Sequence, residues 1–233
     1  MKQLQLGDIV IDIEKKKIKN IHLSVHPPAG RVRIAAPQRM DLDTIRVFAL
    51  SKLNWIKKQQ AKFRAQVREA PREFLNMESH FYNGQRYLLE VVEAEARPRV
   101  ELIHSIIVLY VRPGTTIEKK QSILDEWYRA QLKGVLPALI KKWEKIMNVK
   151  VNEFGIKKMK TRWGTCNRKA KRIWLNLELA KKPPEFLEYV VVHEMVHFLE
   201  RKHNAVFKSY MDEYLPKWRF LKEELNRLPI MFA

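Results

Sequence analysis

Apolar and polar residues alternate along the first forty residues, and this pattern predicts short strands. The β-prone segments are Ile9 to Ile13, Ile18 to Val25 and Arg31 to Ala36, with Pro27-Pro28-Ala29-Gly30 as a turn between the last two. After Asp41 the apolar residues recur at helical spacing among basic ones, which predicts one long helix reaching Phe63.

The alternating pattern returns after Pro71. Asn83-Gly84 is a typical hairpin turn, and it is followed by strands at Tyr87 to Val92, Val100 to Ile103 and Ile106 to Val111. Thr115 or Thr116 is a suitable N-cap for a helix that runs to about Met147. Pro137 is expected to kink this helix or to split it in two, because proline removes a backbone donor.

The last third of the chain predicts a strand, a loop, a strand and then helices. The strands are Phe154 to Met159 and Ile173 to Leu179, with WGTC in the loop between them, and a helix follows from about Glu185 to Glu200. The order of elements predicts an α+β fold. We expect a strand-rich N-terminal part with one long helix, residues 1–113, and a helix-rich part that carries the candidate chemistry, residues 114–233.

Charge changes this picture by indicating possible partners. The formal net charge is +19, and the segment Lys157 to Leu177 holds eight Lys or Arg and no acid. Such a field favours anionic substrates, nucleotides or nucleic acid, although a merely well-solvated basic surface is the alternative. The chain has a single cysteine, Cys166, and we see neither a secretory leader nor an apolar run long enough to cross a membrane. We therefore expect a cytoplasmic protein that does not associate with membranes.

The sequence VVHEMVHFLERKH, Val191 to His203, carries the candidate chemistry. His193 and His197 are four residues apart, so a helix places both imidazoles on one face within reach of a single ion. Glu194 lies on a neighbouring face, where it can take a proton from a water molecule as a general base. A pair of satisfied core histidines is the alternative interpretation.

The third ligand requires a change in chain direction. On a continuous helix His203 would lie about 15 Å along the axis from His193, too far to share an ion. We therefore expect the helix to end near Glu200 to Lys202 and the chain to double back, with Asn204 as the N-cap of the next helix. The rival oxygen ligands are Glu200, Asp212 and Glu213. A three-histidine set with an open position indicates catalytic zinc, and nickel or cobalt could substitute.

Several of these segments resemble the YgjP-like predicted metal-dependent hydrolases, a family related to the SprT and WLM metallopeptidases. The resemblance rests on RWGTC (162–166), the strand with Asn176, YVVVHEMVH (189–197), and His203-Asn204 with Phe207, and it extends to GRVRIAAP (30–37). It implies a zincin-like catalytic domain with an active-site helix below a small sheet. His193, His197 and His203 would bind the metal and Glu194 would be the general base.

The substrate is less determined by the sequence. We expect a zinc-dependent, metallopeptidase-like hydrolase; the alternatives are a nucleotide or phosphoanhydride hydrolase that uses the basic rim, and a nucleic-acid-associated protein with a metal site. Candidate substrate-binding residues are Arg162, Trp163, Asn176 and Tyr189. In this view the strand at 173–179 borders the cleft, and Cys166 either approaches the metal or packs as a small apolar residue.

Overall fold

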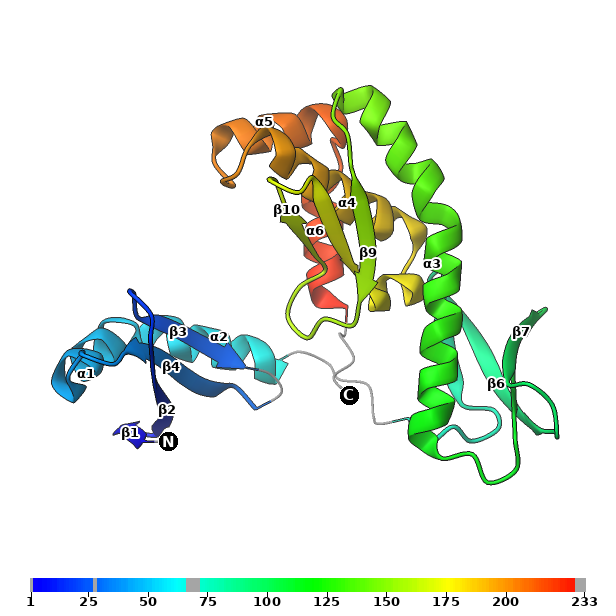
Figure 1. Ribbon diagram of the computed structural model, residues 1–233, viewed down its shortest axis with the longest axis horizontal. Helices are drawn as coiled ribbons and strands as arrows, with labels where there is room; N and C mark the ends of the chain where they lie inside the picture. The colour runs from blue at the N-terminus through cyan, green and yellow to red at the C-terminus, as the bar shows by residue number, and fades with distance from the viewer. Residues whose placement is uncertain (1, 27–28, 66–71, 229–233) are drawn as a thin grey trace. The chain divides into compact units, whose positions relative to one another are not determined.

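The computed structural model describes residues 2–26, 29–65 and 72–228 of the 233-residue chain, and Figure 1 shows them as a mixed α+β fold with three sheets. The described residues form two compact units, one holding residues 2–26, 29–65 and Leu228 and the other residues 72–227. None of the described helices is long and apolar enough to cross a membrane. The α+β fold class predicted from the sequence is confirmed.

The first unit is a four-stranded sheet with two helices. Its elements are β1 (Lys2–Leu6), β2 (Ile9–Lys16), β3 (His22–His26), β4 (Arg31–Pro37), α1 (Leu42–Ser51) and α2 (Leu53–Ala65), and its strand order is β1-β2-β4-β3. Ile11 and Ile34 from the sheet and Ile45 and Ile56 from the helices meet in a fully buried core.

One helix was expected between Asp41 and Phe63, but the chain forms two, because α1 ends at a C-cap on Lys52. The expected turn at Pro27-Pro28 lies outside the described residues. We find one strand more than the sequence predicted, β1, which pairs with β2 in antiparallel register.

The second unit begins with its own four-stranded sheet. Its strands are β5 (Ser79–Tyr82), β6 (Gln85–Glu93), β7 (Arg99–Ile103) and β8 (Ile106–Val111), in the order β5-β6-β8-β7. The predicted hairpin turn is present, since Asn83 and Gly84 both have positive φ, 48° and 78°. This turn also contacts the following part of the unit, where Asn83 N–H donates to the Ala180 carbonyl at 2.9 Å. Pro113, the expected boundary between the two parts of the chain, therefore lies inside this unit.

The long helix α3 (Ile117–Met147) connects the two halves of the second unit. It begins at the N-cap Thr116 and ends at Asn148, which adopts the left-handed conformation. The helix is continuous through Pro137 and is not split there. In Figure 1 it passes β7 and β8 before it reaches η1 and α4.

The remaining elements surround the histidines. They are β9 (Glu153–Lys157), β10 (Gly164–Asn167), β11 (Arg172–Asn176), the 3-10 helix η1 (Leu177–Lys181), α4 (Pro184–Leu199), α5 (Ala205–Tyr214) and α6 (Trp218–Arg227). The sheet order is β10-β11-β9, with β10 antiparallel and β9 parallel to β11. The expected loop at WGTC is wrong, because 164–167 form strand β10, and the second predicted strand ends at Asn176 where η1 begins.

Candidate metal centre

The helix α4 presents two histidines on a side that is only partly buried. Pro184 stands at the first position of the helix, where the missing backbone N–H would have no partner within the helix. Val191, Val192 and Met195 are fully buried, whereas His193 and His197 are half-buried. The apolar sequence thus fixes the orientation of α4 and leaves both imidazoles directed into a cleft.

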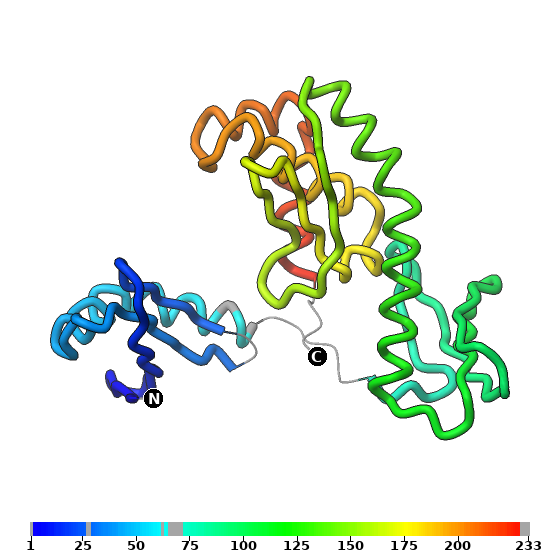
Figure 2. Tube along the Cα trace, in the orientation of Figure 1, coloured from blue at the N-terminus to red at the C-terminus, as the bar shows by residue number. Residues whose placement is uncertain are grey.

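The chain reverses direction immediately after α4. Glu200 has extended backbone angles and ends the helix, and Asn204 caps α5 by accepting a hydrogen bond from Phe207 N–H at 3.0 Å. Within the corner, Lys202 N–H donates to Glu200 Oε1 at 2.8 Å. Figure 2 follows this reversal along the Cα trace. The predicted end of the helix and the predicted cap on Asn204 are both confirmed.

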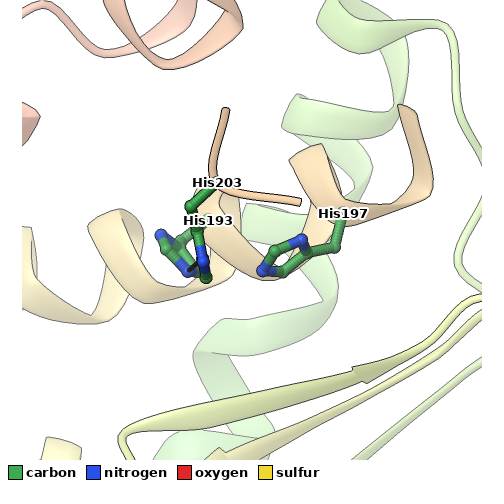
Figure 3. Close-up of side chains that lie close together, drawn as sticks. All are labelled: His193, His197 and His203. Atoms are coloured by element: carbon green, nitrogen blue, oxygen red, sulfur yellow. Dashed lines mark hydrogen bonds between the residues drawn. The ribbon is translucent and has the colours of Figure 1, made fainter. Parts of the chain in front are cut away.

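The reversal brings the third histidine back to the first two. His203 Nε2 lies 3.0 Å from His193 Nε2, and one nitrogen from each of His193, His197 and His203 falls within 4.8 Å of the others. Figure 3 shows the three rings converging, two from α4 and one from the corner. No other group of three or more His, Cys, Asp or Glu side chains with this spacing occurs among the described residues.

A buried phenylalanine supports all three imidazoles. The centroid of the Phe207 ring lies 5.0 Å from that of His193, 4.8 Å from His197 and 4.7 Å from His203. Phe207 is 1% exposed. The first turn of α5 therefore supplies both the capping bond that closes the corner and the apolar base on which the rings rest.

Burial keeps the imidazoles in the form that binds metals. Desolvation is the main cause that lowers the pKa of His193 to about 3, and the neighbouring His197, His203 and Lys222 contribute to that shift. Desolvation also lowers the pKa of His197 and of His203. Neutral imidazole is the ligand form of histidine, so near neutral pH these side chains need not lose a proton to bind an ion.

The ring nitrogens that face away from the cluster show how the donor set is oriented. His197 Nδ1 lies 3.1 Å from the Glu200 carbonyl, which selects the tautomer whose Nε2 is free to bind. Without an ion, the 3.0 Å contact between His193 and His203 is a hydrogen bond when one ring carries its proton on Nε2. The buried His193 Nδ1 has no such partner, which costs free energy in a protein core. A divalent ion on the three Nε2 atoms fits this arrangement.

Glu194 lies beside strand β10. It is 6% exposed, and burial raises its pKa to about 8, an effect that Arg162 partly opposes. A divalent cation on the histidines would favour its carboxylate form. The contact with β10 requires glycine, because a Cβ on Gly164 would lie 2.6 Å from Glu194 Oε1 and 2.9 Å from Val190 Cγ1.

The histidines and Glu194 line an open cleft of about 790 Å³. Its other wall is β10 with its flanking residues, and it carries the cations Arg162, Arg168 and Lys169, while Arg201 comes from the corner. Cys166 also lines the cleft, half-buried, and desolvation with the charge of Glu194 raises its thiol pKa to about 12. Cys166 is not one of the three clustered ligands.

The four candidate substrate-binding residues occupy different environments. Arg162 lines the cleft, whereas Trp163, Asn176 and Tyr189 are not among its lining residues. Asn176 is fully buried, and its amide nitrogen donates to the carbonyls of Met159 and Arg162, both at 2.8 Å. Its observed contacts fix the loop that carries Arg162.

Tyr189 is 5% exposed and packs against the His193 ring with centroids 5.9 Å apart. Burial and the charge of Glu194 raise the pKa of its phenol. The residues that line the cleft include all of β10 and none of residues 173–179. Strand β10 therefore borders the cleft, and the strand that was expected to do so does not.

The rival oxygen ligands lie outside the three-histidine cluster. Asp212 accepts hydrogen bonds from Trp218 Nε1 at 2.7 Å and from Arg219 Nη2 at 3.0 Å. Glu200 is half-buried and accepts the Lys202 N–H, and Glu213 is exposed.

Comparison with known proteins gives one match over most of the chain. The family model described as YgjP-like, metallopeptidase domain, matches residues 19–228. None of the curated proteins matches the chain.

Among solved structures, the chain is similar to the metallopeptidase zymogen abylysin of Pyrococcus abyssi, with 16% identity over 39% of this chain and 91% of that one, and a TM-score of 0.37. The metallopeptidase zymogen jannalysin of Methanocaldococcus jannaschii gives 20% identity over 38% and 91%, and a TM-score of 0.35.

Proposed function

Because the chain belongs to the YgjP-like metallopeptidase domain family, we propose that it is a zinc-dependent peptidase whose metal is held by His193, His197 and His203. The observation that carries the proposal is the convergence of three imidazoles beside a buried glutamate in an open cleft. Nickel or cobalt could occupy the same donor set.

Each residue of the site has a separate role. The three Nε2 atoms would hold a divalent ion, which supplies Lewis-acid polarisation of a carbonyl and acidifies water. Glu194 takes the proton of the attacking water on its carboxylate and passes it to the leaving nitrogen. Its buried position suits this exchange, since a raised pKa makes the carboxylate a stronger base and the acid a stable intermediate form.

The surrounding residues position these groups. The Glu200 carbonyl orients His197, Phe207 supports the three rings, and Gly164 lets β10 approach Glu194 closely. Arg162 is the cleft cation whose charge acts on Glu194, so it is also suited to contact a developing negative charge on the substrate.

The basic lining of the cleft supports a second candidate, hydrolysis of nucleotides or other phosphoanhydrides. Four cations face the site where a polyphosphate would bind. Association with nucleic acid and a cytoplasmic location remain expectations from charge and composition.

The test combines metal analysis with Glu194→Gln. Wild type, purified without chelators, is expected to hold about one metal ion per chain and to cleave members of a peptide library. Glu194→Gln is expected to keep the metal and lose about 10²–10⁴-fold in kcat/KM, the usual contribution of general-base catalysis.

Glu213→Gln is the matched control, since Glu213 is an exposed acid outside the cluster. Absence of bound metal in the wild type would overturn the metal centre. Full activity of Glu194→Gln would overturn the role of Glu194 alone.

A further inference from the structure

The cleft beside the histidines carries an uneven charge distribution. Arg162, Arg168, Lys169 and Arg201 line it, and Glu194 is the one acid in the lining. A catalytic cleft of this kind attracts negatively charged ligands and repels cationic ones.

Two of these cations are held at opposite ends of β10. Arg168 follows the strand, and its Nη2 donates to the Phe198 carbonyl at the end of α4, at 3.1 Å. Arg162 precedes the strand by two residues, and its carbonyl is fixed by the Asn176 amide at 2.8 Å. Guanidinium groups on anchored backbone lose less freedom when they bind a carboxylate than free surface lysines do.

The strand between them has a free edge in the described part of the chain, because β10 pairs there only with β11. An extended peptide can add to such an edge through main-chain hydrogen bonds. Gly164, which touches Glu194, marks where the reacting bond would lie. At about 3.3 Å per residue, Arg162 and Arg168 would then face side chains about two to four residues from that bond.

We propose that the cleft selects extended peptides with acidic side chains on both sides of the cleaved bond, an inference that rests on the peptidase function proposed above. Arg162 and Arg168 lie beyond opposite ends of β10, a separation that matches separate carboxylates on an extended chain better than one compact polyphosphate. The sequence also contains no glycine-rich phosphate loop, the usual cradle for a nucleotide tail.

Binding and cleavage test the proposal separately. Two fluorescent peptides share one scissile bond, with Glu in one and Gln in the other at the flanking positions. Binding is measured by anisotropy on zinc-loaded Glu194→Gln, and kcat/KM on the wild type.

We expect the acidic peptide to bind about 10-fold more tightly at low salt and the preference to shrink as salt rises. Arg168→Glu should remove most of this preference and should favour a matching Lys peptide. Lys141→Glu is the control, because it makes the same charge change on an exposed residue outside the cleft lining.

The outcomes separate this inference from the proposed function. Equal binding of Glu and Gln peptides, or equal weakening of both by Arg168→Glu with metal content unchanged, overturns the acidic-peptide inference and leaves the peptidase intact. Binding of a nucleoside triphosphate that depends on Arg168, together with no preference for Glu peptides, also overturns it. Absence of cleavage with a clear binding preference instead contradicts the proposed peptidase function alone.

Discussion

Two buried polar clusters in the same compact unit differ in whether their polar atoms have partners. In η1, Glu178 and Lys181 are 1% and 6% exposed, and the Lys181 ammonium donates to both carboxylate oxygens at 3.0 and 2.8 Å. In α4, Glu194 is buried and His193 Nδ1 has no partner. The first cluster satisfies itself, whereas the second leaves one buried imidazole nitrogen without a hydrogen-bond partner and brings three ring nitrogens together within 4.8 Å.

The difference separates polar groups that hold the fold from polar groups that serve a ligand. Burial of a charge is tolerated when an opposite charge and hydrogen bonds accompany it. Burial without them costs stability, and such sites persist where function requires them. Satisfaction of buried polar atoms therefore distinguishes the two clusters better than burial does.

The largest expected effect comes from breaking the paired cluster. Lys181→Met leaves the Glu178 carboxylate buried and unpaired, and it should lower the free energy of unfolding by about 3–5 kcal/mol. Glu178→Leu combined with Lys181→Met should recover most of that loss. Urea unfolding of metal-free protein measures both.

Arg227→Met is the matched control for this comparison. Arg227 and Glu224 form an ion pair with the same three-residue spacing on an exposed surface, Nη1 to Oε1 at 2.8 Å. Its loss should change the unfolding free energy by less than about 1 kcal/mol. An effect of Lys181→Met no larger than the control would show that the buried pair does not hold the fold.

The next effect concerns the unpaired cluster. Zinc at about 1,000 times its Kd should raise the unfolding free energy of the wild type by about 4 kcal/mol. His193→Leu should abolish this rise yet leave the metal-free protein as stable as the wild type, because the imidazole it removes has an unsatisfied nitrogen.

Thermal or urea unfolding with and without zinc provides the measurement. His22→Leu, at an exposed position of β3, should keep the full response to zinc. A large loss of metal-free stability in His193→Leu would instead indicate that His193 is a structural core histidine.

The smallest effect is a pH dependence close to the paired cluster. Burial, together with the charges of Arg72 and Lys181, lowers the pKa of His80 to about 4. Glu78, whose Oε1 lies 3.0 Å from His80 Nε2, partly opposes the shift. The His80 imidazole therefore binds a proton more readily in the unfolded chain than in the folded one. The contribution of neutral His80 to the free energy of unfolding is fully present above about pH 6.5. It falls by up to about 3 kcal/mol as the pH drops to 4.

His80→Gln should flatten this pH dependence when metal-free proteins are compared by urea unfolding between pH 7 and 4. His22→Gln should retain the slope of the wild type. An unchanged slope in His80→Gln would show that His80 does not titrate differently in the folded state.

Local signals along the chain predicted much of this architecture. The caps Thr116 and Asn204 and the turn Asn83-Gly84 act through hydrogen bonds or dihedral angles of neighbouring residues, so the sequence alone located them. The end of α4 was deduced from a distance argument, because His203 could not reach the ion along a continuous helix.

Features that depend on distant partners were not predictable. Strand β10 forms because residues 164–167 pair with β11, and neither the length nor the composition of this segment predicts a strand. Gly164 is conspicuous in the sequence, but glycine is needed there because the side chain of Glu194, thirty residues later, approaches it closely. Asn176 was assigned to substrate contact, while the structure surrounds its amide with backbone carbonyls.

The placement of the third histidine beyond the end of α4 has a consequence for metal retention. An ion bound to His193 and His203 would close a ring of chain that includes the corner at Glu200, Arg201 and Lys202, none of which belongs to the three-histidine cluster. Its affinity then includes the entropy of ordering that ring. Substitutions at Arg201 or Lys202, both exposed, can therefore tune how tightly the ion is held while every ligand stays unchanged.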